Sequence, residues 1–358
     1  MKPPVAGVAP RSMPGARRSG RSSVTAVALM GAAVVAVVGS VLTGAAAAGS
    51  APTGVTRWTR FAHVAAVVDL TGPRGDGSLT VATDGRLALL HLGGVPTPFA
   101  DGYRTAKGPE PYVALSTGAT PEGSGCSFAP DGVYALEPKA HPGVIQIDAL
   151  GQVRRLVDLP AGISPGGIAF DDVGRFGHRL LVTAALHGAA VVYAIDCAGR
   201  VATITTRAPS FEGGIVVAPT TFGAFAGDLV GADEHSGRLV AIGPDGGSQI
   251  LARSGLPSGG DIGVESIGVI PTDVRGDSAY LADRRSPGNR HPGTDSILRL
   301  TGAQLAQAGA QSGDLLVATE GGAKTIVVHC ARSCTVRHVA DGPSVSHGEG
   351  HIVFAPGP

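Results

Sequence analysis

The sequence has no excess of either charge, few aromatic residues and none of the short motifs that identify a reaction. Its 358 residues include 28 basic and 28 acidic side chains with no basic stripe, which excludes nucleic acid as an expected partner. Aromatic residues make up 4% of the chain, and Trp58 is its single tryptophan, so platforms for stacking bases or sugars are scarce. A P-loop, a dinucleotide fingerprint and a nucleophile elbow are all missing.

The first fifty residues differ in composition from the rest. Four arginines between residues 11 and 21 precede an apolar run over 24–42 and small residues over 44–49. This order is typical of an export signal, and alanines 46–48 fit a cleavage site. We therefore predict a signal peptide over 1–48, a linker over 49–60 and a folded domain over 61–358. Because the apolar run is nearly long enough to span a bilayer, an uncleaved membrane anchor is the alternative. Either interpretation places the domain outside the cytoplasm.

A repeat predicts the architecture of that domain. The sequence IDALGQV at 147–153 returns as IDCAGRV at 195–201 and more loosely at 242–246. Short apolar runs and glycine turns at a period of this size are typical of a β-propeller. We predict an all-β fold, a six-bladed β-propeller. A pair of β-sandwiches is the alternative architecture, and a seventh blade is possible if residues 53–70 contain one more unit.

Apolar runs also mark the expected inner strands of the blades, at 126–130, 168–171, 215–219, 267–271 and 351–356. The last run has no blade after it, and the N-terminal blade around Ser78 has no such run before it. We therefore expect the C-terminal strand to complete the N-terminal blade and close the ring, which removes open sheet edges.

Four cysteines are present, and an exported chain favours disulfides. Cys330 and Cys334 flank a three-residue turn between two apolar runs, so we predict a hairpin disulfide between them. A zinc site that includes the neighbouring histidines is the alternative, although alternate strand residues face opposite ways. The sequence leaves open whether Cys126 and Cys197 pair.

Acidic residues recur at one position of the repeat. The start of the first strand and the end of the second lie on the same face of a propeller, where binding sites gather. These positions give the candidate metal ligands Glu122, Glu212, Glu265, Glu349 and Asp233. Carboxylates held together need a counter-charge, and Ca²⁺ takes several hard oxygen ligands outside the cell. The alternative is that these side chains point apart and pair with arginines. His347 and His351 flank Glu349 and are further candidate ligands.

The chain resembles the six-bladed propellers of the gluconolactonase/NHL-like superfamily. The resemblance is carried by Pro121-Glu122-Gly123, by the inner-strand sequence GIAF at 167–170 and by the YAID hairpin at 193–196. In the lactonase branch an inner-strand glutamate, asparagines and an aspartate bind a divalent metal that polarises the lactone carbonyl. The resemblance implies that Glu122 is that glutamate. The asparagines have no counterpart, because Asn289 is the only one in the chain.

Two functions follow as expectations. The first is a secreted binding propeller whose acidic channel mouth holds a divalent cation such as Ca²⁺. Its partner at the channel face would be a small molecule, an envelope component or a protein, with membrane contact only through an uncleaved N-terminal segment. The alternative is a metal-dependent lactone or ester hydrolase in which Glu122, Glu212, Glu265 and Asp233 hold the ion and its bound water.

Overall fold

The computed structural model describes residues 54–91, 93–105, 110–138 and 141–357. The predicted signal or anchor over 1–48 lies outside these described residues. Within them, no helix is long and apolar enough to cross a membrane. Regular structure there is almost entirely β-strand, with one α-helix, α1 (Gly302–Gln307), and one 3₁₀ turn, η1 (Gly223–Phe225). The all-β fold is confirmed.

Four sheets each contain four consecutive strands in an antiparallel meander. The first sheet contains β3 (Val67–Thr71), β4 (Leu79–Thr83), β5 (Arg86–Leu90) and β6 (Pro96–Phe99). The second contains β7 (Val113–Leu115), β8 (Val133–Glu137), β9 (Gly143–Ile147) and β10 (Val153–Asp158). The third contains β11 (Ser164–Phe170), β12 (Leu180–Leu186), β13 (Ala189–Ile195) and β14 (Val201–Ala208). The fourth contains β15 (Glu212–Val217), β16 (Leu229–Asp233), β17 (Arg238–Ile242) and β18 (Ser248–Arg253).

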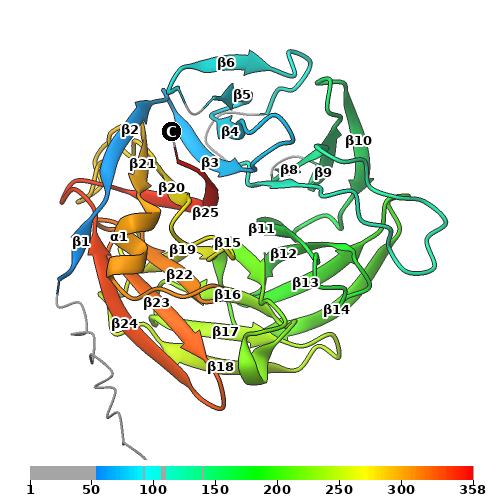
Figure 1. The fold of residues 1–358 in the computed structure, drawn as a ribbon. Coiled ribbons are helices and arrows are strands. Elements are labelled where there is room, and N and C mark those ends of the chain that lie inside the picture. The colour runs from blue at the N-terminus through cyan, green and yellow to red at the C-terminus, as the bar shows by residue number, and fades with distance from the viewer. Residues whose placement is uncertain (1–53, 92, 106–109, 139–140, 358) are drawn as a thin grey trace, which may run out of the picture. The chain divides into compact units, whose positions relative to one another are not determined.

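The remaining strands form a nine-stranded sheet in two parts. One part contains β19 (Val264–Val269), β22 (Leu315–Thr319), β23 (Thr325–Cys330), β24 (Cys334–Asp341) and β1 (Thr56–Arg57). The other contains β25 (Gly348–Pro356), β20 (Asp277–Asp283), β21 (Ser296–Leu300) and β2 (Thr59–His63). The parts join through one parallel pair, Ile267 with His351. Figure 1 shows the sheets arranged around a common centre, with β3, β11, β15, β19 and β25 innermost. The architecture is propeller-like and nearly closed.

The sequence repeat forms the hairpin between the third and fourth strands of a sheet. In the β9–β10 hairpin, the Asp148 carboxylate accepts hydrogen bonds from the backbone N–H groups two and four residues later. Asp196 makes the same two contacts in the β13–β14 hairpin. Gly151 and Gly199 then adopt the left-handed conformation, with φ of 86° and 80°, which glycine adopts without steric cost. The repeat therefore reports the same turn in the second and third sheets.

The ring closes differently from the prediction. β25 pairs with β20 and not with β4, because the N-terminal sheet has its own fully buried inner strand, β3. The N-terminal strand β2 pairs with β21 in the sheet that contains β25, so both ends of the domain meet in one sheet. Strand pairing also begins at Thr56, inside the segment predicted as a linker.

The inner strand of the second sheet is β7, so the prediction of 126–130 for this strand is wrong. Those residues lie in the connection between β7 and β8. The run is apolar because Phe128 packs edge-to-face against Tyr134 and Phe170, with ring centroids 5.3 and 4.9 Å apart. An aromatic residue in a connection can fill the space between two sheets as well as one in a strand does.

Both pairs of cysteines form disulfides. The predicted Cys330–Cys334 bridge joins β23 to β24 across a tight hairpin, which excludes the zinc alternative at these two sulfurs. Cys126 bonds to Cys197, with 5.9 Å between their Cα atoms, and this bridge ties the second sheet to the third.

Candidate metal centre

Acidic side chains gather where inner strands begin and second strands end. β19 pairs antiparallel with β22 so that Val264 lies opposite Thr319. β19 begins where β22 ends, so Glu265, the second residue of β19, and Glu320, which follows β22, lie at the same end of that sheet. Glu349 is the second residue of β25, and β25 lies beside β19. Strand register thus brings together three glutamates from distant parts of the sequence.

These three glutamates are deeply buried. Glu265, Glu320 and Glu349 are 3%, 6% and 2% exposed, and one carboxylate oxygen of each lies within 4.8 Å of the others. Three ionised carboxylates at this spacing repel one another strongly in a low-dielectric environment. They can remain together only if they share protons or a cation.

Tyr112 joins two of them. Its hydroxyl lies 2.6 Å from Glu349 Oε1 and 2.9 Å from Glu265 Oε1. A phenol has one proton to donate, so it can satisfy one ionised carboxylate and must accept a hydrogen bond from the other. Without a cation, Glu265 or Glu349 therefore carries a proton.

Arg284 supplies the positive charge. It follows β20, and its Nη1 lies 3.3 Å from Glu349 Oε2 and closer still to Glu110 Oε1. Among the described residues, it is the only arginine or lysine that forms an ion pair with this group of acids. One guanidinium cannot neutralise three buried carboxylates together with Glu110.

The surroundings separate the pKa values of the three glutamates. Burial is the largest influence on each. It raises the pKa of Glu265 well above its usual range and that of Glu320 to about 10, and repulsion from Glu349 adds to both shifts. Burial acts in the same direction on Glu349, but its hydrogen bonds and the Arg284 charge outweigh it and lower that pKa to about 2. In the absence of a cation, Glu349 is the ionised member of the three.

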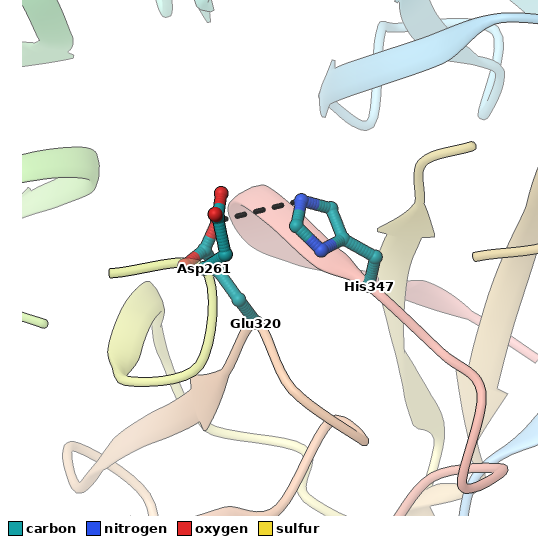
Figure 2. A group of neighbouring side chains, drawn as sticks. All are labelled: Asp261, Glu320 and His347. Carbon is teal, nitrogen blue, oxygen red and sulfur yellow. Dashed lines mark ion pairs between the residues drawn. The ribbon is translucent and has the colours of Figure 1, made fainter. Parts of the chain in front are cut away.

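A second group of ligands lies next to the first. One ligand atom each from Asp261, Glu320 and His347 falls within 4.8 Å of the others. Figure 2 shows these side chains converging, with the ion pair between His347 and Glu320 dashed. Asp261 is exposed, whereas His347 is buried. The backbone N–H of Asp261 donates to Glu234 Oε2 at 3.0 Å, so Glu234 holds the loop that carries Asp261.

Glu212 lies at the rim of the same group. It is the first residue of β15 and is exposed. Partial desolvation raises its pKa to about 7, and repulsion from Glu110 and other nearby glutamates adds to the shift. A carboxyl group with such a pKa can accept or donate a proton at neutral pH.

The structure thus brings together Glu212, Glu265 and Glu349 of the predicted ligands, but not Glu122 or Asp233. Glu122 lies in the β7–β8 connection, at the opposite end of the inner strand, where its N–H donates to the Gly177 carbonyl. The Asp233 carboxylate accepts the N–H groups of His235 and Ser236 and closes the β16–β17 turn. The Asp233 carboxylate is therefore engaged in hydrogen bonds within the hairpin.

Sequence reasoning missed Glu110, Tyr112 and Asp261. Glu110 occupies the position assigned to Glu122, because it precedes β7. The sequence EPYVAL at 110–115 does place an acid before an apolar run, but the strand is only three residues long. Asp261 lies in a loop between β18 and β19 with no repeat counterpart, and no sequence signal marks it.

His351, the other candidate ligand, faces away from the acidic group. Its Nδ1 lies 2.9 Å from Asp69 Oδ2, and Asp69 also accepts the N–H of Val113 at 2.7 Å. Burial alone would lower the pKa of His351, but the charge of the fully buried Asp69 raises it. This pair ties three inner strands together.

A cavity of about 420 Å³ with a mixed polar and apolar lining lies along the channel, with His351 among its lining residues. Its walls are inner-strand residues that include Leu115, Ala169, Val217 and Val269. The backbones of β15 and β25 lie very close together between the cavity and the buried glutamates. A Cβ atom on Gly214 would lie only 2.5 Å from the carbonyl oxygen of Gly350. The cavity is not lined by Glu265, Glu320 or Glu349, so the acidic group and the cavity are separate places in the channel.

No protein-family model matches the sequence, and no curated protein is similar to it. Solved structures do resemble the fold. A calcium-binding protein, regucalcin, from Agrobacterium tumefaciens is 12% identical, with 85% of this chain and 84% of that chain covered and a TM-score of 0.48. A gluconolactonase from Xanthomonas campestris is 13% identical, with 64% and 69% covered and a TM-score of 0.39. A virginiamycin B lyase from Staphylococcus aureus is 14% identical, with 77% and 85% covered and a TM-score of 0.41. The predicted resemblance to gluconolactonase-like propellers is confirmed at the level of fold alone.

Proposed function

We propose that this chain is a secreted, six-bladed propeller that binds a divalent cation at its channel mouth. The count of six treats the nine-stranded sheet as two blades, because its parts share a single residue pair. Two disulfides support export to an oxidising compartment. The bound cation would face a small molecule, an envelope component or a protein at this end of the channel.

One observation carries the proposal. Glu320 is 94% buried, and its Oε2 has no hydrogen-bond partner, although buried polar atoms are almost always satisfied. Ionised carboxylates have no donor to offer one another, so a cation among Glu265, Glu320 and Glu349 would satisfy all three. Their ligand atoms are all oxygens, which is the set that Ca²⁺ prefers.

A metal-dependent hydrolase of lactones or esters is the second candidate. The position of Glu212 favours it, because this exposed carboxyl group lies beside the proposed ion and has a pKa of about 7. A base that titrates near the working pH can take a proton from a metal-bound water. Calcium-dependent opening of a lactone that is lost in Glu212→Gln, with calcium affinity retained, would support this function.

Thermal unfolding of the full chain tests the cation site. After treatment with a chelator, added Ca²⁺ should raise the melting temperature, because a ligand at about 100 times its Kd stabilises the folded state by about 2.7 kcal/mol. Glu265→Gln should abolish the response. Glu122→Gln is the matched control, since Glu122 lies at the other end of the inner strand, and should retain it. A wild-type melting temperature that changes neither with the chelator nor with added Ca²⁺ would contradict the proposal.

A further inference from the structure

The five candidate ligands at the mouth do not converge on one point. They form two groups within the described residues, and each group has its ligand atoms within 4.8 Å of one another. Glu265 and Glu349 belong to the inner group, and Asp261 and His347 to the outer one. Glu320 belongs to both. A carboxylate has two oxygens and can ligate one ion with each. Glu320 therefore occupies the position of a ligand that bridges two ions, one in each group.

Distances in the outer group favour an ion over direct hydrogen bonds. His347 Nε2 lies 3.4 Å from Glu320 Oε1. This separation exceeds the usual N–H···O length. Ligands at 2.0–2.2 Å from a tetrahedral ion lie roughly 3.3–3.6 Å apart. The spacing of these atoms therefore matches the edge of a metal coordination shell.

The charge at the mouth also exceeds what one ion can balance. Among the described residues, seven carboxyl groups interact here, those of Glu110, Glu212, Glu234, Asp261, Glu265, Glu320 and Glu349. Arg284 is the one guanidinium paired with them. A single divalent ion would leave most of this negative charge uncompensated, and a second ion would reduce it further.

We propose that the mouth is a binuclear centre, in which Glu320 bridges an inner ion held by Glu265 and Glu349 and an outer ion held by Asp261 and His347. Figure 2 shows the three side chains of the outer group. This inference rests on the proposed cation-binding function and adds the second ion. The imidazole in the outer group favours a borderline metal such as Zn²⁺ over Ca²⁺. Asp261 is exposed, so the remaining coordination positions of the outer ion face the opening and can receive an oxygen atom of a ligand.

Titration with Mn²⁺, which accepts both carboxylate and imidazole ligands, tests the centre in the full chain. Equilibrium dialysis should give two Mn²⁺ per chain. Electron paramagnetic resonance should show a spectrum broadened by exchange between two bridged ions. Asp261→Asn should reduce the stoichiometry to one and restore the six-line spectrum of an isolated ion. Because Asp261 is exposed, this variant should fold, and its melting temperature without metal provides the check.

The outcomes separate the two proposals. One Mn²⁺ per chain in the wild type, unchanged in Asp261→Asn, would overturn the binuclear centre and leave the single-site function standing. No bound Mn²⁺ together with a melting temperature that does not respond to Ca²⁺ would overturn both. Glu122→Gln should bind two ions with the coupled spectrum, which controls for the loss of a carboxylate elsewhere in the channel. His347→Gln should repeat the effect of Asp261→Asn.

Discussion

Cation binding at the mouth should release protons. Burial raises the pKa of Glu320 to about 10 and that of Glu265 well above its usual range, whereas Glu349 is ionised. A cation ligated by all three carboxylates must displace the protons on the first two. Each released proton makes the affinity rise about tenfold per pH unit. With two protons released, the affinity for Ca²⁺ should increase about 10⁴-fold between pH 6 and pH 8.

Isothermal titration calorimetry measures this effect directly. Titrations at one pH in buffers of different ionisation enthalpy give the number of protons released, which should be about two at pH 7. Glu122→Gln should give the same number, because Glu122 does not contact the group. An affinity that is independent of pH between 6 and 8, or heats that do not depend on the buffer, would refute the protonation states derived from burial.

Three further predictions concern stability. Without metal, the free energy of unfolding should fall as the pH rises from about 5 to about 9. The reason is that Glu265 and Glu320, whose pKa values are raised by folding, bind their protons more tightly in the folded chain than in the unfolded chain. Urea titrations that show constant or rising stability across this window would contradict the prediction. Asp69→Ala should lower the free energy of unfolding by about 3–5 kcal/mol, since a buried imidazolium loses its counter-charge, and a loss below about 1 kcal/mol in urea unfolding would show that the pair is not charged. Replacing Cys126 and Cys197 with serine should lower the free energy of unfolding by about 4 kcal/mol, and replacing Cys330 and Cys334 by about 2 kcal/mol. The first bridge closes a longer loop, with a sequence separation of 71 residues against 4, and so removes more entropy from the unfolded chain. Equal losses in denaturant unfolding would argue against loop entropy as the cause.

The sequence was informative where structure is local. The repeat reports the turn between the third and fourth strands of the second and third sheets, whose aspartate and glycine recur because both hairpins use the same hydrogen bonds and the same left-handed residue. Acids before an inner strand were found at Glu212, Glu265 and Glu349 for the same reason: strand direction places them at one face. The Cys330–Cys334 bridge also follows from a hairpin.

The errors in the predicted ligand set arise where tertiary packing or the hydrogen bonds of a turn determine the position of a side chain. Phe128 made a connection resemble a strand because it is buried between two sheets, and this moved the expected ligand from Glu110 to Glu122. Asp233 ends a second strand as expected, but its carboxylate closes the turn that follows. The position of Asp261 depends on a long connection that meets Glu320 only in the folded chain.

A crystal of the full chain soaked in Mn²⁺ tests the central claim most directly. Anomalous diffraction at the manganese edge should show a peak enclosed by the carboxylates of Glu265, Glu320 and Glu349. A map with no peak there, or with its only peak beside Glu122 or Asp233, would show that the buried glutamates at the mouth do not bind a cation.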